Sequence, residues 1–365
     1  MNIAFLSFSY SGIVANGASE YTERFLKVLS NKGNKVDFYC PYPIKAFKKI
    51  DNVNYIHVPA VKLPFFHYLS FAFNVSKFIK RKNYDIVHSN GGVGIFIKNS
   101  VDFETFHHHE KFTRDNIITY ANYLIYRFAL HRARHIITIS DLAFKEIIQY
   151  EKINQKYVTI VNNSIDCSIF NQTHEFQDLR KDFIQDDNEK LLLCLGGLNE
   201  TRKNQKLSVK TLHFLIQNGI NANLIVIGKG FLQKELITLA TQLKIMDQIY
   251  FLEYVAEIFP YYSIADLLLV PSLHEGFGYP YLEGPACGCK FIAFDTGIAK
   301  IAANAGLGRI AKSDRNFMKL AIEMIQNNEK IGEKEELFIR NEYSLESFKK
   351  KIFRIYNIYL NKRGK

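Results

Sequence analysis

Short apolar runs alternate with longer segments of helical spacing along most of the chain. In the first half, the apolar runs cover residues 2–7, 36–40, 55–58, 86–88, 104–106, 136–140 and 158–161. After the first run, Tyr21, Phe25, Val28 and Leu29 recur every three or four positions, which is the spacing of one helix face. This alternation predicts an α/β fold with a mainly parallel sheet and helices on both of its faces. Ligands of such sheets bind outside the carboxyl ends of the strands.

The second half repeats the pattern after a polar interval. Its apolar runs cover residues 190–195, 224–227, 249–252, 265–270 and 290–293, and we expect the last of these to be the final strand of a second sheet. Helical spacing covers residues 116–134, 316–328 and 344–361. A chain of 365 residues that is 47% hydrophobic can bury two cores. We therefore expect one domain over residues 1–170 and a second over residues 190–343. Residues 171–189 between them are polar and acidic, which predicts a linker with a short surface helix and no contribution to a core.

Charge and cysteine content indicate which partners and which cellular compartment to expect. The net charge is +11, and residues 1–100 hold 13 Lys and Arg against 5 Asp and Glu, so a basic face there should prefer an anionic partner. The basic residues form no recognised nucleic-acid reading module, and we expect no nucleic-acid partner. The five cysteines are scattered and odd in number, which fits a reducing compartment. Because the chain lacks a basic leader and an apolar run near ~20 residues, we expect a cytoplasmic protein.

The densest chemistry follows the apolar run at residues 265–270. Gly276, Phe277 and Gly278 form a loop whose main-chain N–H groups are little covered by side chains, and Pro280 suits the first turn of a helix predicted over residues 279–286. A glycine loop that leads into a helix is a favourable site for an anion.

Two carboxylates flank this loop. Glu275 and Glu283 lie eight residues apart, about two helical turns, so they can contact two ends of an elongated ligand. Read alone, such a pair is more typical of a helix cap and a solvated helix face. A second loop follows the apolar run 190–195, where Gly196 and Gly197 precede Arg202 and Lys203. These cations can bind phosphate oxygens, although alone they fit an exposed turn equally well.

Taken together, these motifs resemble the retaining glycosyltransferases of family 4. The segment EGFGYPYLEGPACG matches their Glu-x7-Glu motif, and Thr105-Phe106-His107 matches a strand that ends in Thr-x-His. Residues 161–170 resemble their interdomain segment, with Ser164 in place of the usual glycine. The resemblance implies the GT-B fold, in which two Rossmann-like domains face a cleft and a terminal helix, here within residues 344–365, crosses back to complete the first domain. It also implies a nucleotide-sugar donor and retention of anomeric configuration.

The resemblance assigns roles to individual residues. Glu275 and His107 would contact the donor sugar, Glu283 the ribose hydroxyls, and Arg202 and Lys203 the diphosphate. Many family members have arginine where Gly197 stands, so Arg202 and Lys203 remain as the phosphate cations. The implied donor-binding set is Gly17, Gly196, Gly197, Gly276, Phe277, Gly278 and Glu283.

No cofactor is expected beyond the donor itself. The glycines near residue 17 do not form the G-x-G-x-x-G motif of nicotinamide enzymes. No Asp-x-Asp pair stands in a strand-end loop, and the adjacent His107, His108 and His109 cannot all face one ion, so we expect no metal site and metal-independent activity.

The sequence leaves alternatives open for the role of residues 63–82 and for the function. Residues 63–82 combine aromatic side chains with a basic end, which fits either a core-packing helix or a helix on the anionic inner face of the plasma membrane. A basic, aromatic surface favours a glycan or lipid-linked acceptor of a cell-envelope polysaccharide or lipopolysaccharide. The alternative functions are a GT-B-like nucleotide-sugar epimerase and a non-catalytic nucleotide-sugar binding protein.

Overall fold

The structure is a computed structural model of the chain and describes residues 1–10, 17–30, 33–43, 49–61, 64–80, 83–107, 117–172, 176–253 and 255–363. It divides into two compact units. The first unit comprises Met1–Ser164 and Leu345–Lys365, and the second comprises Ile165–Ser344. The end of the chain thus belongs to the same unit as its beginning.

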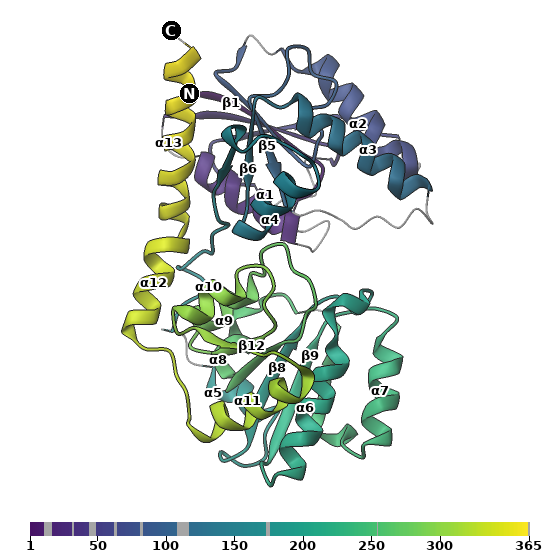
Figure 1. Cartoon of the computed structure of the whole chain (residues 1–365), viewed down its shortest axis with the longest axis vertical. Helices are drawn as coiled ribbons and strands as arrows, with labels where there is room; N and C mark the ends of the chain where they lie inside the picture. The colour runs from purple at the N-terminus through teal and green to yellow at the C-terminus, as the bar shows by residue number, and fades with distance from the viewer. Residues whose placement is uncertain are drawn as a thin grey trace. The chain divides into compact units, whose positions relative to one another are not determined.

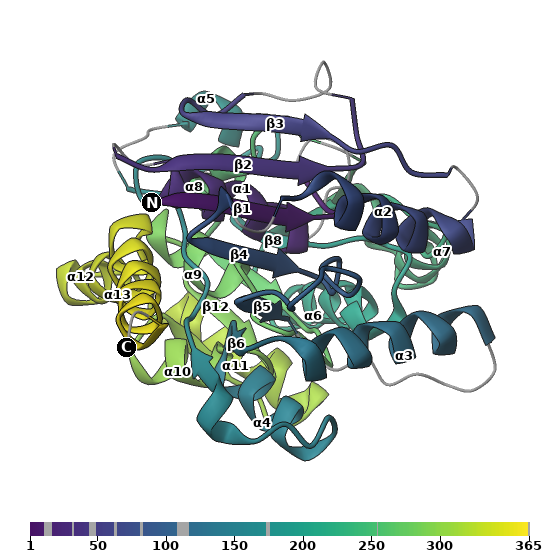
Figure 2. The same ribbon diagram turned by 90° about the horizontal axis from the view of Figure 1, so that it is seen from above.

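The first unit is built on a parallel sheet. Its strands are β1 (Asn2–Ser7), β2 (Lys35–Cys40), β3 (Val53–His57), β4 (Ile86–Asn90), β5 (Phe103–Phe106), β6 (His135–Thr138) and β7 (Val158–Ile160). They lie in the order β3-β2-β1-β4-β5-β6-β7, and Figure 2 shows the strands from β3 to β6 side by side in this order. Every pair is parallel, as the apolar pattern predicted.

Helices cover both faces of this sheet, because successive strand residues point to opposite sides. On one face, Phe5 packs against Phe25 of α1 (Gly17–Leu29), and Phe25 packs against Phe348 of α13 (Leu345–Arg363). On the other face, Ala4 and Leu6 share a core with α2 (Pro64–Phe78) and α3 (Ile117–Arg132). Helix α4 (Asp141–Gln149) lies between β6 and β7 in the chain, and Ser140 caps its first turn by accepting a hydrogen bond from the Ala143 N–H. Figure 1 shows α13 as a long helix beside this unit, and its Tyr356 packs against Phe103 of β5.

The second unit holds a second parallel sheet. Its strands are β8 (Lys190–Leu195), β9 (Ala222–Ile227), β10 (Ile249–Leu252), β11 (Leu267–Val270), β12 (Phe291–Ala293) and β13 (Gly308–Ile310). The order is β10-β9-β8-β11-β12-β13. We expected residues 290–293 to form the final strand, and this was wrong, because β13 pairs beyond β12 in parallel. The side chains of β13 are only partly buried, and its sequence has no apolar run from which the strand could have been predicted.

Helices also sandwich the second sheet. One face packs against α6 (Gln205–Gln217), α7 (Gln233–Gln242) and α11 (Asp314–Gln326). Tyr281 of α9 (Pro280–Ala286) packs on the opposite face against Phe291. The second unit also contains α5 (Gln177–Lys181), α8 (Phe259–Ile264), α10 (Ala299–Asn304) and α12 (Glu333–Tyr343).

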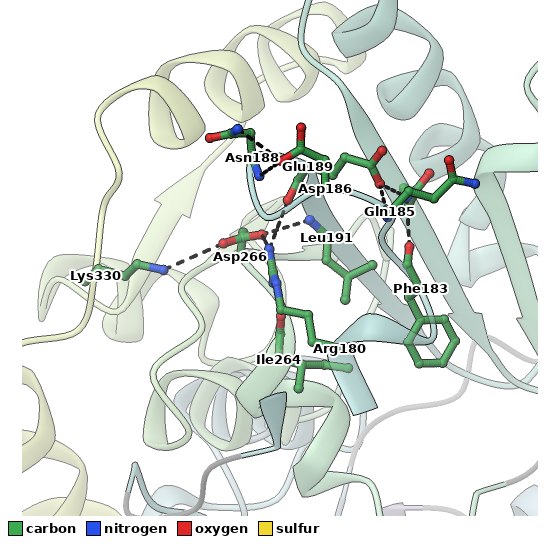
Figure 3. Close-up of polar contacts among 11 residues, drawn as sticks. Arg180, Phe183, Gln185, Asp186, Asn188, Glu189, Leu191, Ile264, Asp266 and Lys330 are labelled. Carbon is green, nitrogen blue, oxygen red and sulfur yellow. Dashed lines mark hydrogen bonds and ion pairs between the residues drawn. The ribbon is translucent and has the colours of Figure 1, made fainter. Parts of the chain in front are cut away.

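Residues 176–189, expected to contribute nothing to a core, are instead anchored to the second sheet. Phe183 and Ile184 are buried. The Arg180 guanidinium contacts the Asp266 carboxylate at 2.7 Å, and the same carboxylate accepts a hydrogen bond from the Leu191 N–H at 2.8 Å (Figure 3). This ion pair joins α5 to the starts of β8 and β11, at the edge of the sheet opposite the strand ends that carry the predicted site. This ion pair could not be predicted from local sequence, because Arg180 and Asp266 are 86 residues apart.

Candidate active site

The loops that follow β8 and β9 are held tightly together at the carboxyl ends of these strands. The Gly196 N–H donates to the Ile227 carbonyl at 3.0 Å, and the Leu198 N–H donates to the Lys229 carbonyl at 3.0 Å. Gly228 has a φ of +154°, and a Cβ there would lie 2.1 Å from the Gly196 carbonyl oxygen. Glycine is therefore required at position 228 for the loop that holds Gly196 and Gly197 to take this path.

The β8 loop is also fastened to the loop after its other neighbour, β11. The loop continues through a 3₁₀ turn at Thr201–Lys203 into α6. The Leu273 N–H donates to the Arg202 carbonyl at 2.8 Å, and Arg202 Nη1 donates to the His274 carbonyl at 2.8 Å. The loops after two adjacent parallel strands thus bring Arg202, Lys203 and Glu275 together at the carboxyl ends of the strands, where we predicted a ligand site.

Charges of both signs meet in this cluster. Lys203 Nζ lies 2.7 Å from Glu275 Oε1, and Arg202 Nη1 lies 3.8 Å from Glu275 Oε2. Arg202 also pairs with Glu200 at 2.5 Å. The Lys203 and Glu275 side chains are 20% and 12% exposed, so their pair is partly desolvated and stronger than a surface ion pair. The arrangement offers an anionic ligand two cations that already have carboxylate partners.

The glycine loop has a fixed path into α9. Gly278 has a φ of +85°, and a Cβ there would lie 2.2 Å from the Tyr281 ring. Phe277 is buried, and its carbonyl accepts a hydrogen bond from the Ile298 N–H at 3.0 Å. The helix expected over residues 279–286 is confirmed as α9, Pro280–Ala286.

Glu283 lies on α9 and is buried, so it is not the solvated helix face that an isolated Glu-x7-Glu pair would suggest. The Tyr262 hydroxyl donates to Glu283 Oε2 at 3.2 Å. Burial, and then the Glu283 charge, raise the pKa of Tyr262 well above its usual value, so this phenol stays protonated and remains a donor. Sequence reasoning missed Tyr262, which lies 21 residues upstream on α8 with no motif around it.

His107 belongs to the first unit and directly follows β5. Its Nε2 lies 2.7 Å from Asn90 Oδ1, at the end of β4, and the Tyr21 ring meets the imidazole edge-on with centroids 5.0 Å apart. Gly17 opens α1 and is exposed. His108 and His109 lie outside the described residues. Asn90 and Tyr21 were not predicted, because no local spacing links them to His107.

The structure therefore brings the predicted residues together in two groups, one in each unit. Gly196, Gly197, Arg202, Lys203, Glu275 and the residues from Gly276 to Gly278 lie on the joined loops of the second sheet, and Glu283 lies on the helix that follows. His107 and Gly17 lie in the first unit.

Comparison with known proteins finds matches to both units. Residues 175–344 match the model of the family described as glycosyl transferases group 1, and residues 15–169 match the model described as glycosyltransferase family 4. Among curated proteins, the chain is 22% identical over 324 residues, 81% of each chain, to an uncharacterized glycosyltransferase of Methanocaldococcus jannaschii. It is 23% identical over 232 residues to an O-antigen chain mannosyltransferase of Salmonella typhimurium, covering 62% of this chain and 59% of that protein.

Solved structures share the fold. The Anabaena protein HepE in complex with UDP-glucose superposes with a TM-score of 0.77 at 17% identity, over 98% of this chain and 99% of that one.

Proposed function

The chain belongs to the glycosyl transferases of group 1, family 4, and has their GT-B fold of two Rossmann-like units, and from this premise we propose its reaction. It transfers a sugar from a nucleotide-diphosphate sugar, with a UDP-sugar favoured, to an acceptor hydroxyl, with retention of anomeric configuration and without a metal ion. UDP is favoured because the similar HepE structure holds UDP-glucose.

The observation that carries the proposal is the contact between Lys203 and Glu275 at the joined loops of β8 and β11. The barrier to transfer lies in breaking the bond between the anomeric carbon and the leaving diphosphate, so the site must stabilise negative charge that grows on the diphosphate. Lys203 and Arg202 supply that charge stabilisation. When the diphosphate binds, it replaces Glu275 as their partner and releases this carboxylate to accept hydrogen bonds from sugar hydroxyls.

The other residues position the donor. Glu283, which accepts a hydrogen bond from Tyr262, also accepts hydrogen bonds from the two ribose hydroxyls. His107 of the first unit contacts the sugar. The glycine-rich loop from Gly276 to Gly278 lets the main chain approach the phosphates closely.

A thermal-shift screen with UDP-, GDP- and ADP-sugars in metal-free buffer tests this proposal. A ligand that binds only the folded chain raises the melting temperature by mass action, and we expect a UDP-sugar to do so. Slow release of UDP from the bound sugar would then identify a transferase that lacks its acceptor. No stabilisation by any of these donors would contradict the proposed reaction.

The proposed acceptor is a glycan or lipid-linked intermediate of a cell-envelope polysaccharide or lipopolysaccharide. Similarity to the O-antigen chain mannosyltransferase supports this class. Such acceptors are held at membranes, so the first unit is expected to bind an anionic membrane surface peripherally. None of the helices in the described ranges is both long and apolar enough to span a membrane.

Of the two interpretations of residues 63–82, core packing holds for one side of α2, and membrane binding stays a proposal for the exposed side. Phe71, Ala72 and Val75 are buried against the sheet, as a core-packing helix requires. Exposed aromatic side chains on α2, on α3 and after β4 include four phenylalanines that we call the aromatic patch: Phe66, Phe73, Phe96 and Phe128. Lys77 lies over the Phe73 ring at 4.1 Å, so basic and aromatic groups are interleaved on this surface, as on proteins that bind anionic bilayers.

A further inference from the structure

A buried hydrogen-bond network connects His107 to β1, β4 and α1. Asn90 Nδ2 lies 3.2 Å from Ser7 Oγ and 3.1 Å from Thr22 Oγ1, and Asn90 Oδ1 lies 2.7 Å from His107 Nε2. Ser7, Thr22 and Asn90 are at most 3% exposed. Each hydrogen of this network is therefore donated to another protein group. Its position follows from the donors and acceptors that surround it.

Each hydroxyl has one proton, and main-chain carbonyls accept both. Ser7 Oγ donates to the Ser9 carbonyl at 3.1 Å, and Thr22 Oγ1 donates to the Ala18 carbonyl at 3.0 Å. The two hydroxyls also lie 3.1 Å apart, but a bond between them would use one of these same protons. Toward Asn90, both can therefore only accept.

This fixes the orientation of the Asn90 amide. Its NH₂ group must face Ser7 and Thr22, so its carbonyl oxygen must face His107. A carbonyl oxygen only accepts, so the hydrogen between Asn90 and His107 belongs to His107 Nε2. In the neutral imidazole, Nδ1 then carries no hydrogen and can only accept a hydrogen bond.

We infer that Asn90 is a positioning residue that holds the neutral His107 imidazole in the Nε2–H tautomer, in which Nδ1 is the acceptor nitrogen. The edge-on Tyr21 ring holds the plane of the same imidazole, and the Tyr21 hydroxyl is itself held at 3.0 Å from Thr105 Oγ1. The role of Asn90 in turnover rests on the proposed function of His107, whereas the tautomer follows from the network alone.

Nitrogen-15 spectra of the histidine side chains test the tautomer in the full chain without any substrate. The His107 signals are assigned by their loss in His107→Gln. For the neutral imidazole of the wild type, we expect a protonated Nε2 and an unprotonated Nδ1. Asn90→Leu keeps the side-chain size but removes the acceptor, and should give a mixture of tautomers.

The matched control is Asn54→Leu, the same substitution at an exposed asparagine of β3 in the same unit. It should leave the His107 signals unchanged. A protonated Nδ1 in the wild type, or unchanged His107 signals in Asn90→Leu, would overturn the inference.

Kinetics test the consequence for turnover. Asn90→Leu should lower kcat about tenfold with little change in the KM for the donor, whereas Asn54→Leu should change neither. An unchanged kcat in Asn90→Leu, or a change in donor KM alone, would contradict a positioning role. Absence of transfer by the wild type with every donor would count against the proposed function, while the spectra would still decide the tautomer.

Discussion

At the scale of single residues, two buried titratable groups in the first unit respond to pH in opposite directions. Glu104 on β5 is fully buried, and burial raises its pKa to about 8 from an ordinary 4.5. His88 on β4 is also fully buried, and burial lowers its pKa to about 3 from an ordinary 6.5. Both groups are therefore neutral in the folded protein near pH 7.

Linkage gives the sign of each effect. The folded state keeps the Glu104 proton that the unfolded chain loses above pH 4.5, so its contribution to stability falls as pH rises from 4.5 to about 8. The unfolded chain protonates His88 below pH 6.5 while the folded state does not, so stability also falls as pH drops from 6.5 toward 3. Between pH 4.5 and 6.5 the two effects oppose each other.

Glu104→Gln isolates the first effect. The amide keeps an acceptor for the Gly92 N–H, which now donates to Glu104 Oε1 at 2.7 Å, but it does not titrate. We expect the wild type to lose stability relative to Glu104→Gln by up to about 1.4 kcal/mol per pH unit between pH 4.5 and 8. Urea unfolding of both proteins at pH 5, 6.5 and 8 measures this, and parallel pH profiles would contradict a buried neutral carboxyl.

The predicted site residues should differ in the step that they affect. Loss of the ribose contact in Glu283→Ala should raise the donor KM about tenfold or more, with a smaller effect on kcat. Glu275→Ala and His107→Ala should lower kcat, by about 100-fold where transition-state contacts are lost. Steady-state kinetics with the donor found in the screen measures these values. Equal and small effects in all three variants would contradict the assigned roles.

At the scale of secondary-structure elements, α13 is attached to the first sheet by a polar contact inside the core. The Tyr356 hydroxyl lies 2.6 Å from Nδ1 of the fully buried His88, and His88 Nε2 lies 2.8 Å from Thr105 Oγ1. A buried imidazole nitrogen without a hydrogen-bond partner is costly, so α13 contributes a hydrogen bond to the core as well as apolar side chains.

Tyr356→Phe should therefore destabilise the protein by about 1–3 kcal/mol, although it removes a single oxygen atom. Chemical denaturation followed by circular dichroism measures the change. Ile358→Ala, at an exposed position of the same helix, serves as the control and should change stability little. A Tyr356→Phe variant as stable as this control would show that His88 does not depend on α13.

Elements were predictable from the sequence where they carry their own pattern. Apolar runs located the other strands of both sheets to within a few residues, but β13 and the polar helix α12 have no such run. The glycine and glutamate motifs located the loops of the second sheet. Asn90 and Tyr262 were missed because their contacts, to His107 and Glu283, depend on how the chain folds and not on local spacing.

At the scale of the whole molecule, the excess positive charge of the first 100 residues and the aromatic patch suggest how the protein reaches its acceptor. We expect the chain to bind vesicles that contain anionic lipid and to bind neutral vesicles weakly, with affinity that falls as salt rises. Exchanging Phe66, Phe73 and Phe128 together for serine should weaken binding about tenfold or more, because their insertion is lost.

Vesicle co-sedimentation measures this binding. The control is Phe231→Ser, which alters a phenylalanine that is 66% exposed in the second unit. Equal binding by the triple variant and the wild type would assign the patch to another partner.

The path of the chain also sets an order of assembly during synthesis. The first unit is made of two separate segments, because the chain leaves it after Ser164 and returns at Leu345. A ribosome completes all of Ile165–Ser344 before it makes α13, so the second unit can fold while the first still lacks its last helix. Until then, His88 has no Tyr356 and Phe25 has no Phe348. The first unit lacks α13 for as long as the ribosome needs to translate these 180 residues, about 10–40 s at ordinary elongation rates. A nascent chain stalled within that interval should be a substrate for chaperones and proteases through its first unit.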